Sequence, residues 1–273
     1  MIGIQPLIDI CSLTLQTAYL KEHNGVSLLL IASPETAKTT TIFNFNNLDF
    51  VSYYDEITAK KLIDEFLPMC KLKQKRTLLI PDLINCIDKQ KSTRNQFLNI
   101  LKSGIDDIGI TKIETYHKHL DIKEIAYHQY FSGVRFNMVS AITSNSFSAV
   151  QKRMKATGLL SRFLPFSYDY PINKVTKIFD FLEKENTDND FFIPKIVKRE
   201  TAIQGNSALF SEFRLISSKL GEFYGGYGFR CQKSLQRLAK ANALMNGRKE
   251  VIEEDIQKIL ELSRWINYDF NSL

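Results

Sequence analysis

The spacing of apolar side chains divides the chain into two unlike parts. In the first part, short and nearly continuous apolar runs alternate with amphipathic stretches. Such runs are typical of strands in a parallel sheet that is covered on both faces. We expect strands within residues 25–32, 48–55, 76–82, 134–143 and 162–170, and helices near residues 4–20, 38–45, 58–70 and 92–104. Strands that alternate with helices predict a three-layer α/β base with a mainly parallel sheet.

Beyond about residue 171 the periodicity becomes helical. Three apolar stripes recur at helical spacing after Gly205, separated by "YGGYG" at 224–228 and "NG" at 246–247. The stripes comprise Leu209, Phe210, Phe213, Ile216 and Leu220, then Leu235, Leu238, Ala241 and Leu244, then Val251, Ile256, Ile259, Leu260 and Ile266. We therefore predict an α/β base over residues 1–172 and a small all-helical domain over residues 173–273. The stretch 105–131 fits either a β-hairpin or an inserted loop.

The composition fits a globular protein with a substantial core. Hydrophobic residues make up 44% and charged residues 24% of the 273 residues, close to the averages for soluble domains. The longest apolar runs are too short to cross a bilayer, so we expect no membrane segment. The four cysteines are widely scattered and form no C-x-x-C pair, which favours reduced thiols in a cytoplasmic protein over a disulfide framework or a zinc site.

The chain is basic, with a formal net charge of +6 and a pI of about 9.0. A positive balance is typical of proteins that bind nucleic acid, but solvated surface lysines produce it equally well. Both interpretations stay open at this point.

The stretch "IASPETAKTT" at 31–40 follows the first predicted strand and matches part of a phosphate-binding loop. The pattern G-x-x-x-x-G-K-[ST] places a lysine against phosphates and a hydroxyl on a magnesium ion. Lys38 and Thr39 occupy those two positions, whereas the two glycine positions hold Ala32 and Ala37. A loop between a parallel strand and a helix directs backbone N–H groups at an anion.

The residues expected to contact a nucleotide are Ala32, Ser33, Pro34, Glu35, Thr36, Ala37, Lys38, Thr39 and Thr40. The alternative is an ordinary strand–turn–helix connection that carries a surface lysine. The rest of the chain has to distinguish the two.

Further groups that phosphoryl transfer needs follow in order along the chain. Asp82 ends the third predicted strand, where its carboxylate can organise magnesium. Thr143 and Asn145 end the fourth strand with a hydroxyl and an amide that can orient an attacking water. Arg162 precedes the fifth strand and Arg230 begins a helix of the second domain. Both arginines can neutralise charge that develops on a transferring phosphoryl group.

In this order the residues resemble the AAA+ ATPases, and within them the minichromosome maintenance (MCM) helicases. The MCM loop runs G-D-P-G-x-A-K-S, so "ASPETAKT" is similar at Pro34, Ala37 and Lys38 and has Thr39 in place of serine. On this resemblance the alanine before the lysine is no defect. The resemblance covers residues from about 26 to 265, with gaps around 105–135 and 172–205.

Two motifs near the domain boundary extend the resemblance. "LLSRF" is similar to the family's arginine-finger motif, which assigns that role to Arg162. "FRCQKSLQRLAKANAL" resembles the lid helix R-x-L-E-x-x-x-R-x-x-x-A, with Arg230 as the sensor-2 candidate and Arg237 as a second basic position. "EVIEEDI" resembles the start of the last lid helix.

The resemblance implies a nucleotide site for ATP and Mg²⁺. Lys38 would hold the β- and γ-phosphates, and Thr39 and Asp82 would hold the magnesium ion. Thr143, or Asn145 beside it, would position the attacking water. The implied fold is an AAA+ base followed by a helical lid, and the implied enzyme is an ATPase of the DNA helicase type.

The resemblance also implies assembly. The subunits would form a homo- or hetero-oligomeric ring that acts on DNA during replication, with a replication protein as a further partner. Arg162 would reach into the site of the adjacent subunit, and Arg230 would couple the lid to the nucleotide state.

DNA contact is expected through residues 105–131, where this family carries hairpins that point into the pore of the ring. The candidates for the phosphate backbone are Lys112, Lys118, His119 and Lys123. A solvated loop with ordinary lysines is the alternative. The two histidines of "HKH" at 117–119 lack partners at ligand spacing and make a poor metal site.

Three departures from the MCM pattern favour a second interpretation. Ala32 replaces the first loop glycine, and Glu35 replaces a middle glycine and brings a carboxylate toward the phosphates. The second acid expected after Asp82 is missing, because Leu83 follows. The alternative to an active ATPase is therefore a hydrolysis-poor helicase loader or regulatory subunit, and a third interpretation is that nucleotide binding has been lost.

Overall fold

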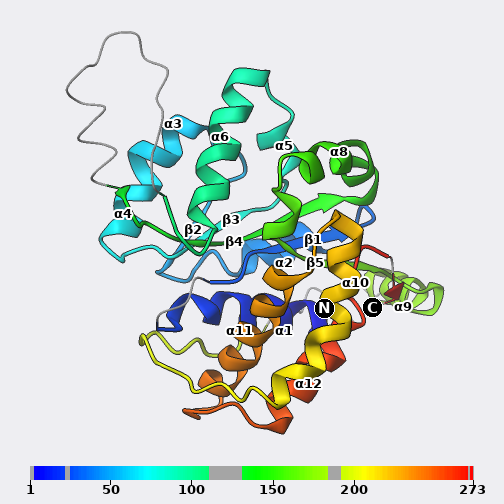
Figure 1. The fold of residues 1–273 in the computed structure, drawn as a ribbon. Helices are drawn as coiled ribbons and strands as arrows, with labels where there is room; N and C mark the ends of the chain where they lie inside the picture. Colours follow the sequence, from blue (N-terminus) through cyan, green and yellow to red (C-terminus); the bar gives the residue numbers. More distant parts are fainter. Residues whose placement is uncertain (1–2, 22–24, 111–130, 184–191, 270, 273) are drawn as a thin grey trace.

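A computed structural model describes residues 3–21, 25–110, 131–183, 192–269 and 271–272. Its centre is a parallel sheet in the order β2-β3-β4-β1-β5-β6 (Figure 1). The strands are β1 (Leu28–Ala32), β2 (Val51–Tyr53), β3 (Thr77–Ile80), β4 (Asn137–Thr143), β5 (Leu164–Asp169) and β6 (Asn271–Ser272). The parallel α/β base predicted from the sequence is confirmed.

Helices cover both faces of this sheet (Figure 1). One face carries α3 (Ala59–Lys61), α4 (Leu67–Lys71), α5 (Ile84–Ile87), α6 (Lys91–Gly104) and α8 (Ser144–Ala156). The π-helical turn η2 (Leu62–Phe66) joins α3 to α4, so the helix expected near residues 58–70 is continuous but contains this turn. The opposite face carries α1 (Gln5–Gln16), the 3-10 turn η1 (Thr17–Tyr19) and α2 (Lys38–Asn44).

The central strand shows why the apolar runs are continuous. Leu28 and Leu30 of β1 belong to the core on the side of α1 and α2. Leu29 and Ile31 belong to the core on the other face. Successive side chains of a strand point to opposite faces, so a strand that is covered on both sides buries every position, and in β1 all five residues are apolar.

The strands run in one direction, which places all of their carboxyl ends at one edge of the sheet. In register, Ala32 lies beside Thr143 of β4 and Tyr168 of β5. The segments that follow β1, β4 and β5 therefore lie next to one another. Ligands of open α/β sheets bind at this edge.

The second part of the chain is helical, as predicted. It begins with α9 (Ile172–Glu183), has no helix over residues 192–208, and continues with the 3-10 turn η4 (Leu209–Phe213) and the helices α10 (Arg214–Tyr224), α11 (Phe229–Met245) and α12 (Glu253–Ser263). The predicted stripes face inward: Phe213, Leu238 and Ile259 are fully buried. Helix α1 packs against α11, so one apolar core runs from the sheet into the helical part.

The chain returns to the sheet after α12. Ser167 of β5 donates its backbone N–H to Trp265 O at 2.8 Å, and β6 pairs with β5. Tyr268 stacks on Phe223 of α10 with ring centroids 3.9 Å apart and on Phe147 of α8 at 5.7 Å. The carboxyl-terminal segment therefore joins the helical part to the base, while the division at residue 172 stays a prediction.

The structure also bears on several smaller predictions from the sequence. β3 ends at Ile80, as Pro81 predicts. All four cysteines are free and buried. Helix α9 (Ile172–Glu183) has no buried residue. Among the described residues, no helix combines the length and apolar character needed to cross a bilayer. The hairpin or loop expected at 105–131, with Lys112, Lys118, His119 and Lys123, lies largely outside the described residues.

Candidate nucleotide site and arginine cluster

The connection from β1 to α2 is a strained turn. Glu35 and Ala37 adopt left-handed backbone conformations, with φ of 63° and 62°. They are two of the three residues other than glycine with positive φ in the described chain, and such conformations cost about 1–2 kcal/mol each. Ala32 is still part of β1, so the first glycine position requires no unusual backbone here. The side chain of Glu35 is exposed.

Lys38 folds back beneath this turn. Its Nζ donates to Ala32 O at 3.0 Å, to Ser33 O and to Thr36 Oγ1 at 3.1 Å. Burial lowers the pKa of Lys38 to about 8, and the charges of Asp82 and Asp169 act in the opposite direction. The turn therefore encloses a buried ammonium group whose three N–H donors are taken by two carbonyl oxygens and one hydroxyl of the turn itself.

Residues of β5 and the segment after it tie the turn down. Tyr168 and Tyr170 donate their hydroxyls to Thr36 O at 2.8 and 3.2 Å, and Ser33 Oγ donates to Asp169 Oδ2 at 2.9 Å. These contacts hold the left-handed conformations in place. The sequence interpretation missed them, although "SYDY" at the end of the fifth predicted strand lies at the same sheet edge.

Backbone donors at the start of α2 remain available. Within the described residues, the N–H groups of Lys38, Thr39 and Thr40 meet no acceptor. Thr39 and Thr40 are exposed. The turn thus presents hydroxyls and N–H donors outward above a buried lysine, which is a donor set that fits a phosphate group.

Asp82 lies at the same edge, after β3. Its Oδ1 accepts the backbone N–H of Ile84 at 3.2 Å. Burial raises the pKa of Asp82, while the Ile84 N–H and the charge of Lys38 act to lower it. Its carboxylate and the Thr39 hydroxyl are oxygen ligands of the kind that Mg²⁺ prefers in company with phosphate oxygens. Leu83, at the position of the missing second acid, is fully buried.

The two residues expected to orient water occupy different environments. Thr143 caps α8, because its Oγ1 accepts the backbone N–H of Ser146 at 3.2 Å and lies 2.9 Å from Ser146 Oγ. Asn145 is exposed in the first turn of α8. Since Thr143 lies beside Ala32 in register, both belong to the edge that carries Lys38.

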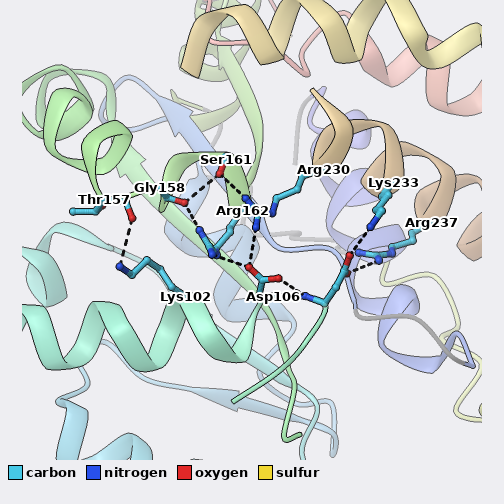
Figure 2. Close-up of polar contacts among 10 residues, drawn as sticks. Lys102, Asp106, Thr157, Gly158, Ser161, Arg162, Arg230, Lys233 and Arg237 are labelled. Atoms are coloured by element: carbon cyan, nitrogen blue, oxygen red, sulfur yellow. Dashed lines mark hydrogen bonds and ion pairs between the residues drawn. The ribbon is translucent and has the colours of Figure 1, made fainter. Parts of the chain in front are cut away.

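The two predicted arginines gather elsewhere. Arg162 ends the 3-10 turn η3 (Leu160–Arg162), just before β5. It therefore lies at the edge of the sheet where the parallel strands begin, which we call the amino edge; the opposite edge, where they end, is the carboxyl edge. The strand between Leu164 and Asp169 separates the amino edge from Ser33 by about 17 Å. Arg230 lies in the first turn of α11, and its guanidinium reaches Ser161 and Asp106 beside Arg162 (Figure 2).

Two aspartates after α6 connect these arginines to the helical part (Figure 2). Asp106 Oδ2 lies 2.7 Å from Arg162 Nη2 and 3.0 Å from Arg230 Nη2. Asp107 pairs with Lys233 at 3.0 Å and with Arg237 at 2.6 Å. Burial alone would raise the pKa of Asp107, but the hydrogen bonds from Arg237 and Lys233 lower it.

This cluster joins three segments that are distant in sequence. Arg162 also donates from Nη1 to Gly158 O at 2.6 Å, and Arg230 donates to Ser161 Oγ at 3.3 Å. The sequence interpretation identified Arg162, Arg230 and Arg237 but missed both aspartates. No local pattern marks them, because their partners are more than 50 residues away.

The fold and the site define a class: a parallel α/β base, with a lysine-bearing turn after its central strand, followed by a helical lid. Residues 224–263 match the family model described as AAA lid domain. The matched segment contains α11 and α12. The match supports an AAA+ ATPase module, and the architecture is that of an AAA+ base with its lid.

Proposed function

We propose that this chain is an MCM-like AAA+ module that binds ATP and works on DNA in replication as part of a ring assembly. The observation that carries the nucleotide site is the turn at residues 33–37, which is held in a glycine-type conformation over the buried Nζ of Lys38. The contacts from Tyr168, Asp169 and Tyr170 maintain that conformation.

In this proposal the chain's own groups bind and orient the triphosphate. Lys38 exchanges its contacts with Ala32 O and Ser33 O for the β- and γ-phosphates. The N–H groups at the start of α2 donate to phosphate oxygens. Thr39 and Asp82 would hold Mg²⁺, which when bound would neutralise charge on the triphosphate. Thr143 or Asn145 orients the attacking water.

The position of the arginines supports a shared site. Arg162 and Arg230 lie at the amino edge, so neither approaches Lys38 of the same chain. A ring of head-to-tail interfaces brings the amino-edge cluster of one subunit to the carboxyl edge of its neighbour. There a γ-phosphate would take the place that the Asp106 carboxylate occupies in the single chain.

A second candidate function is a hydrolysis-poor helicase loader or regulatory subunit. Buried Leu83 in place of a second acid favours it, because no carboxylate follows Asp82 to polarise a water molecule. Both candidates bind ATP, and they differ in turnover.

The deciding experiment measures ATP binding and turnover of the full chain with and without single-stranded DNA. Lys38→Ala is the test variant, and Lys219→Ala, an exposed lysine of α10, is the matched control. We expect binding and DNA-stimulated turnover in the wild type and the control, and neither in Lys38→Ala. Binding without turnover would identify the loader or regulator, and no binding by the wild type would refute both.

A further inference from the structure

A basic pocket lies at the amino edge of the sheet, opposite the turn at residues 33–37, which we call the nucleotide turn. Its volume is about 380 Å³, which is within the range of ligand sites. Its walls come from the end of η1, the turn after α4, the residues that lead into β4, and Glu200. Thr77 and Asn137, where β3 and β4 begin, pair in register beside it.

Positive side chains dominate this pocket. Six cationic residues and one acidic residue line it, whereas the whole chain has a net charge of +6. The cations are Lys21, Lys71, Lys73, Lys75, Arg76 and Arg135. The excess of five positive charges in one concave site exceeds what an even scatter of solvated lysines would give.

Glu200 occupies the pocket as an internal anion. Its Oε1 lies 3.0 Å from Lys73 Nζ and 2.9 Å from Arg76 Nη2. These hydrogen bonds lower the pKa of Glu200, against the opposite effect of burial. Arg76 is also held over the ring of Tyr19, with Cζ 4.7 Å from the centroid. A carboxylate thus already uses two of the cations in the manner of a ligand.

The remaining cations include three without such a partner. Lys21, Lys71 and Arg135 are exposed and form no ion pair within the described residues. The turn that follows Lys71, the last residue of α4, is strained, because Lys73 has a φ of 57°. Strained turns of this kind are enriched at ligand sites.

We propose that this pocket binds the phosphodiester backbone of single-stranded nucleic acid. Cations from separate segments match a chain of phosphates better than a single carboxylate, and a bound strand would displace Glu200 from Lys73 and Arg76. The proposal deepens the proposed action on DNA. Because the pocket and Lys38 lie at opposite edges of the sheet, strand binding does not require the nucleotide turn.

The first test is charge reversal in the full chain, read by fluorescence anisotropy with a labelled oligothymidylate. The variant is Lys71→Glu/Arg135→Glu, and the control is Lys152→Glu/Lys219→Glu, two exposed lysines of α8 and α10. Both lower the net charge by four. We expect the pocket variant to bind at least about tenfold more weakly and the control to change little. Equal losses would show general electrostatics and overturn the proposal.

The second test removes the internal anion. Glu200→Gln should bind the oligonucleotide a few-fold more tightly, whereas Glu212→Gln, an exposed acid of η4, should not. Neutralisation in Lys71→Ala/Arg135→Ala should reduce the magnitude of the salt slope of log K by about 1.4, at roughly 0.7 per phosphate contact of a single strand. An unchanged slope would contradict the assignment.

Two further outcomes separate this proposal from the nucleotide site. Lys38→Ala should retain oligonucleotide binding. If the wild type fails to bind ATP while the pocket variants still lose the oligonucleotide, the nucleotide function alone is refuted.

Competitors identify the ligand of the pocket. Inorganic tripolyphosphate that competes as well as the oligonucleotide would replace nucleic acid by a small polyphosphate as the ligand. A ribonucleotide oligomer bound much more tightly would replace DNA by RNA.

Discussion

Single residues of the nucleotide turn show how a phosphate-binding turn can form when other residues replace its glycines. Ala32 fits without strain because it is the last residue of a strand. Ala37 and Glu35 carry the left-handed conformations that glycine adopts freely. The contacts of Tyr168, Tyr170 and Asp169 with the turn compensate for that strain, which explains how a degenerate sequence pattern keeps the geometry.

Lys38 makes the turn sensitive to pH. Its pKa in the folded chain is about 8, below the usual lysine value of about 10.4. The folded state therefore loses this proton first, and the contribution of Lys38 to stability rises as pH increases from about 8 to 10.4. A bound phosphate favours the charged form, so the dissociation constant for ATP should increase about tenfold between pH 7 and pH 9.

Both effects can be measured against Lys38→Met, which has no titrating group. The difference in free energy of unfolding between the wild type and Lys38→Met, followed by urea denaturation, should shift in favour of the wild type above pH 8. Taking the difference cancels the buried thiols and phenols, whose pKa values burial raises in the folded chain and which titrate in this pH range only once the chain unfolds. A pH-independent difference, or ATP affinity that stays constant to pH 9, would exclude a lowered pKa.

Among the elements, the turn between α10 and α11 depends most strictly on its glycines. Gly228 has a φ of 77°, and a Cβ added there would lie 1.9 Å from Ser217 O. Gly221 of α10 faces the same turn, where an added Cβ would lie 2.4 Å from Gly228 N. The close approach of the two helices therefore leaves no space for a side chain.

Gly228→Ala should lower the free energy of unfolding by about 2–4 kcal/mol, since strained backbone and overpacking add. Gly247 is a matched control, because its φ is 72° and an added Cβ meets no described atom within 4 Å. Gly247→Ala should cost only about 1 kcal/mol. Urea denaturation of both variants decides the matter, and equal costs would show that the contact with Ser217 relaxes freely.

The elements also show where prediction from sequence succeeds. The apolar runs are continuous in β1 and β3, because a strand covered on both faces leaves a strong local pattern, whereas β2, β4 and β5 are located from runs that a serine interrupts. The stripe ending at Leu244 located α11, because a helix buried on one face repeats apolar residues at helical spacing. β6 has two residues and exists through its pairing with β5, so no local pattern marks it. The carboxyl-edge position of Lys38 and Asp82 can be predicted from sequence, because each residue follows a strand of a parallel sheet. The salt bridges of Asp106 cannot, because they depend on tertiary packing.

For the whole molecule, the two sheet edges carry complementary halves of the proposed catalytic site. The turn with Lys38 lies at the carboxyl edge, and the cluster of Arg162, Arg230 and Asp106 lies at the amino edge. A single chain cannot bring them together without rebuilding its sheet. In the proposed ATPase, activity therefore requires assembly, and an isolated subunit should be nearly inactive.

Complementation between two inactive variants tests this arrangement. Arg162→Ala should abolish turnover while ATP affinity stays largely intact, because Arg162 does not touch the nucleotide turn of its own chain. Lys38→Ala should lose both. Co-expressed in equal amounts, the two variants should recover about a quarter of wild-type turnover, since random head-to-tail assembly pairs an intact turn with an intact arginine at about one interface in four. Full activity of Arg162→Ala, or of a monomer, would show that Arg162 is no part of the site. A mixed assembly that contains both variants and stays inactive would show that the site is not shared between subunits.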